Sequence, residues 1–323
     1  MRQKDFEVRH GEQWKRLEAD LKILEERKPA GSAQLGTFPR HYRQVCHHLA
    51  LARERQYAPQ LIDRLDNLVQ QGHRHFYRAS SFTLTSVLLF LTGDFPALVR
   101  AERKMVWLAL ALLFVPMIAM TMTVYFAPQM AYTMFDHASL TVFDNMYDPH
   151  SGHVGRERTS DSDFMMFGYY VKNNIGISFQ TFSGGLLYGL GSLFYLVYNG
   201  LVMGAVAGHL TNIQFGSTFY PFVVGHGAFE LTAIALSGAA GLKLGFALIA
   251  PGRKKRLAAL RDAAHSSVRI MYGVVVMLLI AAMIEAFWSS LHMVSPAIKY
   301  ATGAMLWLLV VAYFTFAGRS RAA

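Results

Sequence analysis

Two ionisable residues in a long, almost uncharged stretch are the strongest candidates for chemistry. Residues 177–250 carry only two charged side chains, Glu230 and Lys243, and His226 stands four residues before Glu230. Residues four apart share one face of a helix, so the imidazole and the carboxylate are predicted to lie close together. A charged carboxylate at membrane depth costs roughly 2.5 kcal/mol or more, so Glu230 should face the protein interior and be paired or protonated.

Three interpretations of this pair are open: a structural hydrogen-bond network between helices, a relay for protons or solutes, and a metal or catalytic site. Polar residues in the same stretch that could join it are Asn173, Asn174, Asn199 and His209. The structural network is favoured because the spacing of His226 and Glu230 differs from the H-E-x-x-H metal motif, and further metal ligands would have to come from elsewhere. We therefore predict no metal, no cofactor and no catalytic residue. Glu285, a second acid in an apolar segment, is predicted to pair with Lys243 and to have a structural role.

The composition is that of a membrane protein with a soluble part. Of the 323 residues only 16% are charged and 53% are hydrophobic, and the 26 glycines outnumber the 21 acidic residues. Residues 1–104 nevertheless hold 18 Lys/Arg and 12 Asp/Glu. This mixture of charges, without an aromatic stacking platform, argues against nucleic-acid binding. The single Cys46 excludes an intramolecular disulfide, and with His41, His47 and His48 it does not make a convincing zinc site.

The first 104 residues are predicted to form two elements. Apolar residues at three- and four-residue spacing, such as Trp14, Leu17 and Leu21, predict a cytosolic head of amphipathic helices over residues 1–79. Residues 80–104 contain an apolar run that is interrupted at residues 93–96 and is shorter than the roughly 20 residues of a membrane span. We predict an interfacial elbow helix there.

The remaining residues, 105–323, are predicted to form an all-α, polytopic transmembrane domain of about six helices. Residues 105–127 can cross, and Arg100, Arg103 and Lys104 before them place the N-terminus in the cytoplasm. Residues 128–171, with six acidic residues, are predicted to form an external loop. Residues 251–269 are strongly basic and hence cytoplasmic, so an odd number of crossings separates them from that loop.

Three crossings between residues 171 and 252 are favoured, with turns near residues 198–200 and 212–219. A single crossing with a re-entrant hairpin over residues 177–219 is the alternative. A final hairpin of residues 270–291 and 299–317 then completes six spans.

Glycines four residues apart predict close contacts between these helices. Small residues at this spacing let helix backbones approach closely in lipid. The alternative interpretation is that the glycines flank broken helices whose backbone binds an ion or substrate. The same ridges serve packing within the chain or a homo-oligomer equally well. The glycines are Gly185, Gly189, Gly200, Gly204, Gly208, Gly241 and Gly245.

Several strings resemble the stage II sporulation protein M family of bacterial integral membrane proteins. They are Asn173-Asn174, the Gly-rich segment ending Asn199-Gly200-Leu-Val-Met-Gly204, and His226-Gly-Ala-Phe-Glu230-Leu-Thr-Ala-Ile before Gly241. The head looks similar in Trp14-x-x-Leu17-Glu18, Tyr42-Arg43 and Leu65-Asp66-Asn67-Leu68-Val69. The resemblance covers about residues 6–250.

The resemblance implies a multi-pass protein of the bacterial cytoplasmic membrane that acts as a scaffold and not as an enzyme. Its sporulation members work beside peptidoglycan hydrolases, and other relatives are encoded near a MoxR-type AAA ATPase and a von Willebrand A-type protein. The extended head resembles the non-sporulating relatives more closely. We expect a non-enzymatic envelope scaffold that contacts membrane lipid. The alternative is a proton-coupled channel or transporter with a His226/Glu230 site.

Overall fold

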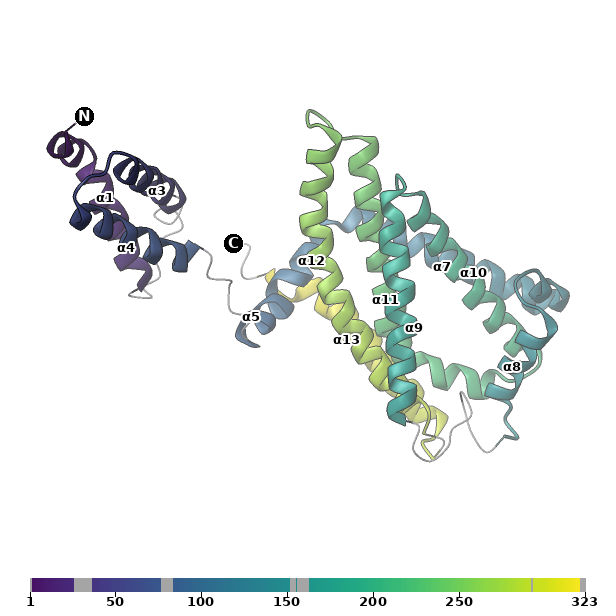
Figure 1. Ribbon diagram of the computed structural model, residues 1–323. Coiled ribbons are helices and arrows are strands. Elements are labelled where there is room, and N and C mark those ends of the chain that lie inside the picture. The colour runs from purple at the N-terminus through teal and green to yellow at the C-terminus, as the bar shows by residue number, and fades with distance from the viewer. Residues whose placement is uncertain are drawn as a thin grey trace. The chain divides into compact units, whose positions relative to one another are not determined.

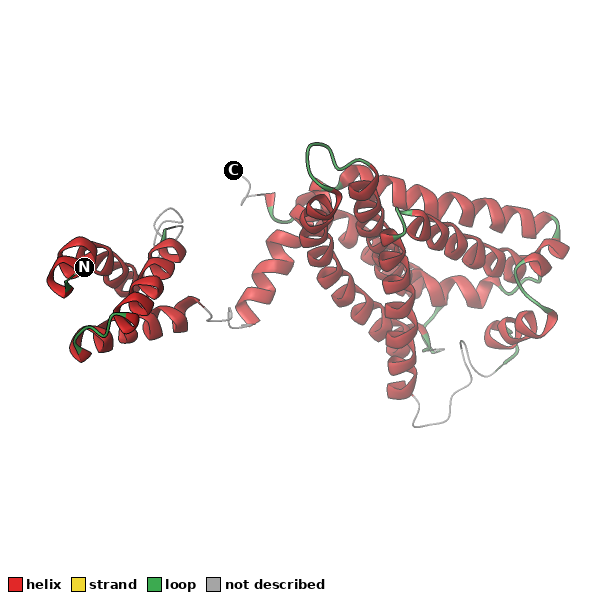
Figure 2. Ribbon diagram, turned by 45° about the horizontal axis from the view of Figure 1, so that its top comes forward, coloured by secondary structure: helices red, strands yellow, loops and turns green. Residues whose placement is uncertain are grey.

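The computed structural model describes residues 2–25, 37–76, 84–151, 155, 163–291 and 293–319 of the chain. All regular structure in these residues is helical and includes twelve α-helices, which confirms the predicted fold class (Figures 1 and 2). The chain divides into two compact units, Met1–Thr83 and Leu84–Ala323.

The first unit is the helical head. It consists of α1 (Gln3–Glu25), α3 (Phe38–Glu54) and α4 (Pro59–Phe76), and each of these helices packs against the other two. Trp14, Leu17 and Leu21, predicted to share a face, are buried together. The shared core also contains Phe6, Phe38, Tyr42, Val45, Leu49, Ala52, Leu61, Leu65 and Leu68. The head therefore has a hydrophobic core of its own.

The second unit opens with a helical segment that the sequence predicted to be interrupted. Its parts are α5 (Leu84–Leu89), the π-helical turn η1 (Phe90–Asp94) and α6 (Phe95–Ala101). The predicted interruption at residues 93–96 is wrong, because the chain stays helical through η1. Because the helix runs on from η1 into α6, the missing N–H of Pro96 removes one backbone bond; the Leu91 carbonyl instead accepts a hydrogen bond from the Tyr313 hydroxyl. Leu84–Ala101 counts among the candidate spans by length and composition; its interfacial position stays a prediction.

The other helices form the bundle. Their bounds are α7 (Arg103–Phe126), η2 (Pro128–Thr133), α8 (His137–Tyr147), α9 (Asp163–Ser183), η3 (Gly184–Leu186), α10 (Leu190–Asn212), α11 (Gly216–Ile249), α12 (Arg256–Met283), η4 (Ile284–Ser289) and α13 (Pro296–Phe316). Six helices of the described chain are long and apolar enough to cross a membrane. Large apolar side chains on them, such as Trp107, Leu308 and Phe316, are exposed, as lipid-facing positions are. By helix composition this is a multi-pass membrane protein.

The six candidate spans differ in membership from the six that the sequence predicted. Leu84–Ala101 is among them, and α9 is not. Lys172, the two following asparagines and Gln180 make α9 more polar than its neighbours. α9 nevertheless packs against α10, α11 and α12.

Three sequence-based boundaries need correction. The turn expected near residues 198–200 is wrong, because Asn199 lies in the middle of α10; the chain turns at residues 184–189 instead. The predicted external loop contains two short helices, η2 and α8, and the beginning of α9, while its residues 152–154 and 156–162 lie outside the described part of the chain. The predicted basic loop is only a short turn, because α12 begins at Arg256.

Helix α11 is central to the bundle, where it packs against α7, α9, α10, α12 and α13. The turn between α11 and α12 and the turn before α10 lie at one end, the top in Figure 1, which we call the basic end. The segment between α12 and α13 and the helix α8 lie toward the opposite end, which we call the loop end. α11 thus connects both ends and carries His226 and Glu230 between them.

Candidate functional site within the transmembrane bundle

The predicted pair lies on the inner face of α11. His226 Nε2 is 3.8 Å from Glu230 Oε2, and the two side chains are only 5% and 14% exposed. That separation is too long for a hydrogen bond but short enough for a strong electrostatic interaction. The buried ring of Phe222 packs edge-on against the imidazole, with centroids 5.4 Å apart. The pair is therefore shielded from its surroundings.

A second acid joins the pair from a different helix. Glu285 lies on η4, and its carboxylate, the Glu230 carboxylate and the His226 imidazole offer ligand atoms that lie within 4.8 Å of one another. η4 is a π-helical turn, a feature often found at functional sites. Gly225 lies beside this turn, where an added Cβ would make ordinary contacts with Ile284 and Trp288. We call His226, Glu230 and Glu285 the intramembrane cluster.

Two further polar residues surround the cluster. Ser289 Oγ is 3.1 Å from His226 Nδ1, and the Ser289 carbonyl accepts a 2.7 Å hydrogen bond from Lys299 Nζ. Lys299 lies on α13 and is buried. Because Ser289 binds one ring nitrogen, the other, Nε2, faces the Glu230 carboxylate. Such an arrangement can hold a proton or a cation between the acids and the imidazole.

The sequence did not predict that Glu285 joins His226 and Glu230, or that Ser289 and Lys299 lie beside them. The predicted pairing of Glu285 with Lys243 is wrong, because Lys243 bonds Glu102 and Ser266. Lys299, a charged residue within a predicted span, was the signal available in the sequence.

The other polar residues predicted for the site lie elsewhere. His209, at the loop end of α10, bonds Asp144 of α8 at 2.8 Å. Asn199 is buried in α10 and donates to the carbonyl of Tyr195 in its own helix. Asn173 is exposed on α9 and donates to Asn174 at 2.9 Å. Asn174 is buried, and its Nδ2 has no hydrogen-bond partner among the described residues.

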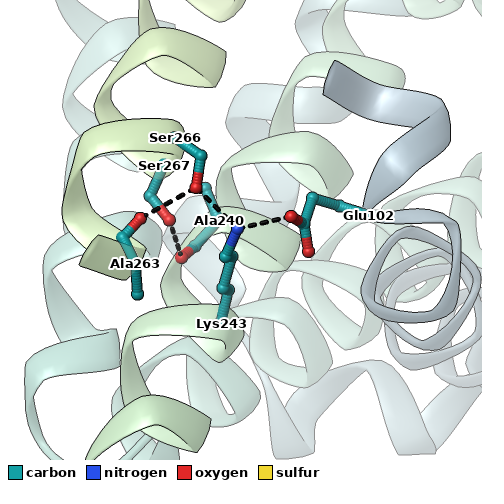
Figure 3. Close-up of polar contacts among 6 residues, drawn as sticks. All are labelled: Glu102, Ala240, Lys243, Ala263, Ser266 and Ser267. Atoms are coloured by element: carbon teal, nitrogen blue, oxygen red, sulfur yellow. Dashed lines mark hydrogen bonds and ion pairs between the residues drawn. The ribbon is translucent and has the colours of Figure 1, made fainter. Parts of the chain in front are cut away.

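A second polar site, at the basic end, joins three helical segments (Figure 3). Lys243 of α11 donates to the Glu102 carboxylate, at the junction of α6 and α7, and to Ser266 Oγ of α12 at 2.5 Å. Ser267 Oγ donates to the Ala240 carbonyl at 3.1 Å. This network ties α7, α11 and α12 together near their basic ends.

The glycines of α10 lie against the backbone of α7. A Cβ on Gly200, Gly204 or Gly208 would collide with a carbonyl oxygen of α7, at Leu113, Met117 and Thr121 respectively. Both sets of residues are spaced by four, so one row of each helix faces the other. The two backbones approach as closely as small-residue ridges allow.

The other glycines hold the turn before α10 against α11. Gly185 meets the backbone of Gly241, and the backbone of Gly189 would collide with a Cβ on Gly245. Gly189 has a φ of +83°, which an L side chain rarely adopts. The turn geometry therefore requires glycine at position 189, and the close contact requires it at position 245.

Comparison with known proteins identifies the family of this bundle. The family model described as Stage II sporulation protein M matches residues 104–290. The chain belongs to the stage II sporulation protein M family. In this family member the matched region runs from α7 through η4, so it contains the whole intramembrane cluster, whereas Lys299 lies beyond it.

The head of this stage II sporulation protein M family member matches a different model. Residues 4–78 match a Domain of unknown function (DUF8413). The expectation that the family resemblance includes the head is therefore wrong, and the family match extends further along the chain than residue 250, to residue 290. No curated protein and no solved structure matches the chain.

Proposed function

We propose that this protein is a non-enzymatic scaffold of the bacterial cytoplasmic membrane, in which the bundle anchors a head that binds protein partners. The observation that carries the proposal is the division of the chain into a membrane bundle and a helical head with its own core. A separate compact unit, matched by its own domain model, is suited to recruit a partner.

The close backbone contacts of the bundle support a scaffolding role. Glycine ridges join α10 to α7, and the glycine turn joins η3 to α11. Close-packed interiors resist deformation and keep their elements in fixed positions. A bundle of this kind suits an anchor better than a machine with large internal movements.

The orientation follows from charge. Arg253, Lys254, Lys255 and Arg256 lie at the basic end, and short loops rich in Lys and Arg stay in the cytoplasm. We infer that the head and the basic end are cytoplasmic and that η2 and α8 are external.

The family supplies the classes of partner. We propose envelope proteins, either peptidoglycan hydrolases or a MoxR-type AAA ATPase with a von Willebrand A-type protein, together with membrane lipid around the bundle. Nucleic acid is not among the proposed partners. Self-association of the chain is compatible with the same role.

The test is cross-linking in native membranes, followed by purification and mass spectrometry, of three forms of the protein. They are the full chain, the chain without residues 1–83, and the full chain with Leu65→Asp, which places a charge in the core of the head. We expect envelope proteins with the full chain and their loss from both altered forms, while all three remain monodisperse in detergent. Retention of the same partners without the head would refute the proposal.

The alternative, a proton-coupled channel or transporter, stays a prediction. Purified full-length protein in liposomes provides its test, and solute flux that depends on a proton gradient would favour transport over scaffolding.

A further inference from the structure

We propose that the intramembrane cluster of His226, Glu230 and Glu285 binds one divalent transition-metal ion, with Zn²⁺ the best match. The bound ion would link α11 to η4. The proposal does not depend on the scaffold function, because it concerns the inside of the bundle and makes no use of the head.

The geometry of the three side chains fits a metal ion. Four-coordinate Zn²⁺ has ligand bonds of about 2.0–2.2 Å, which place ligand atoms roughly 3.3–3.6 Å apart. Here His226 Nε2 and Glu230 Oε2 are 3.8 Å apart, and the ligand atoms of all three residues lie within 4.8 Å of one another. The ligand atoms must therefore approach one another by up to about 1.5 Å to bind one ion.

The hydrogen bond between His226 and Ser289 supports the assignment. A histidine that binds metal through one ring nitrogen commonly uses the other to bond a neighbouring oxygen, which fixes the orientation of the ring. Ser289 Oγ lies 3.1 Å from His226 Nδ1, while Nε2 points toward the carboxylate of Glu230. Ser289 is itself held in place, because its carbonyl accepts a hydrogen bond from the buried Lys299.

The charges of the cluster also favour a cation. Two carboxylates this close in a poorly solvated interior cannot both be ionised without compensation. A divalent cation neutralises both, and the imidazole adds a nitrogen ligand that Zn²⁺ accepts more readily than Mg²⁺ or Ca²⁺.

Three protein ligands leave one position of a tetrahedral ion open. Each helix segment contributes at least one ligand, two from α11 and one from η4. The ion would therefore hold the loop end of α12 against α11.

The experiment measures metal in the full-length protein, purified in detergent without chelator and without a metal-affinity step. Wild type is compared with His226→Gln, Glu285→Gln, Ser289→Ala and a matched control, His209→Gln, which changes a histidine of the same bundle that bonds Asp144 instead. We expect about one Zn²⁺ per chain in wild type and control, and its loss from His226→Gln and Glu285→Gln. Ser289→Ala should weaken Zn²⁺ binding by about 10- to 100-fold.

A second measurement uses wild type alone, because a cluster variant can fail to fold. Chelation should lower the thermal midpoint, and Zn²⁺ but not Mg²⁺ should restore it. Folded wild type without metal and without a response to Zn²⁺ overturns the proposal, as does equal metal content in all variants. A Glu285→Gln protein that is as stable as untreated wild type identifies a protonated hydrogen-bonded cluster and also overturns it.

Discussion

Replacing Gly204 by alanine should destabilise the bundle by about 1–3 kcal/mol, the usual cost of overpacking a tight contact. The new Cβ would collide with the Met117 carbonyl oxygen and lie 2.9 Å from Met120 Cβ, whereas carbon atoms prefer about 3.5–4.0 Å. α10 must therefore move away from α7 by up to about 1 Å. A gap of 0.5–1 Å removes roughly a quarter to a half of each van der Waals contact along the interface, including those at Gly200 and Gly208.

Thermal unfolding of the full-length protein in detergent measures this loss. We expect the midpoint to fall by about 2–12 °C, from roughly 2–4 °C per kcal/mol for a chain of this size class. The matched control is Gly176→Ala on α9, where nothing lies within 4 Å of an added Cβ. Its midpoint should stay the same or rise slightly, because alanine favours helix. A Gly204→Ala protein that melts no lower than the control would refute the reasoning.

Three further predictions concern other parts of the chain. Lys243→Met leaves the partly buried Glu102 carboxylate without its cation and should cost about 1–3 kcal/mol; adding Glu102→Leu should recover part of the loss, as thermal midpoints of the single and double variants will show. In the head, burial and the neighbouring His10 and His47 lower the pKa of His48 to about 4, so its neutral ring, which accepts from Trp14, is favoured in the folded state. The unfolded chain takes up this proton near pH 6.5, so the contribution of His48 to the stability of the head is fully present above that pH. As the pH falls to 4, up to about 3 kcal/mol of stability is lost. Thermal scans from pH 7 to 4 should show this loss in wild type but not in His48→Gln. Asp136 accepts a 2.8 Å hydrogen bond from the Ser139 N–H at the start of α8, so Asp136→Ala should cost about 1 kcal/mol and speed hydrogen exchange of α8 amides, whereas Asp136→Asn should not.

Local patterns in the sequence were sufficient for the parts of the fold that depend on local physics. The spacing of Trp14, Leu17 and Leu21 predicted a helix face that the structure buries in the head. The uncharged run after Lys104 predicted α7 to within two residues at each end. The four-residue spacing of His226 and Glu230 placed them on one face of a helix, as α11 shows.

Long-range contacts determine the features that the sequence did not predict. Glycines in an apolar stretch are compatible with both a span and a turn, and it is the approach of Gly241 and Gly245 that makes residues 184–189 a turn. Glu285 joins His226 from η4, a π-helical turn that no local pattern indicates. Pairing Glu285 with Lys243 matched the charges correctly but ignored Glu102, which bonds Lys243 from a distant part of the chain.

The contacts of α11 differ along its length, and this determines where the bundle can respond to a bound ion. Near the basic end, Gly241 and Gly245 meet backbone atoms of the segment that includes η3, and such contacts cannot adjust by side-chain rotation. About 22 Å away along the helix, His226 faces η4 through side chains that can rotate. A change of charge or ligand at the intramembrane cluster should therefore shift η4 and the parts of α9 and α13 that contact it, while α10 and the basic half of α11 keep their positions.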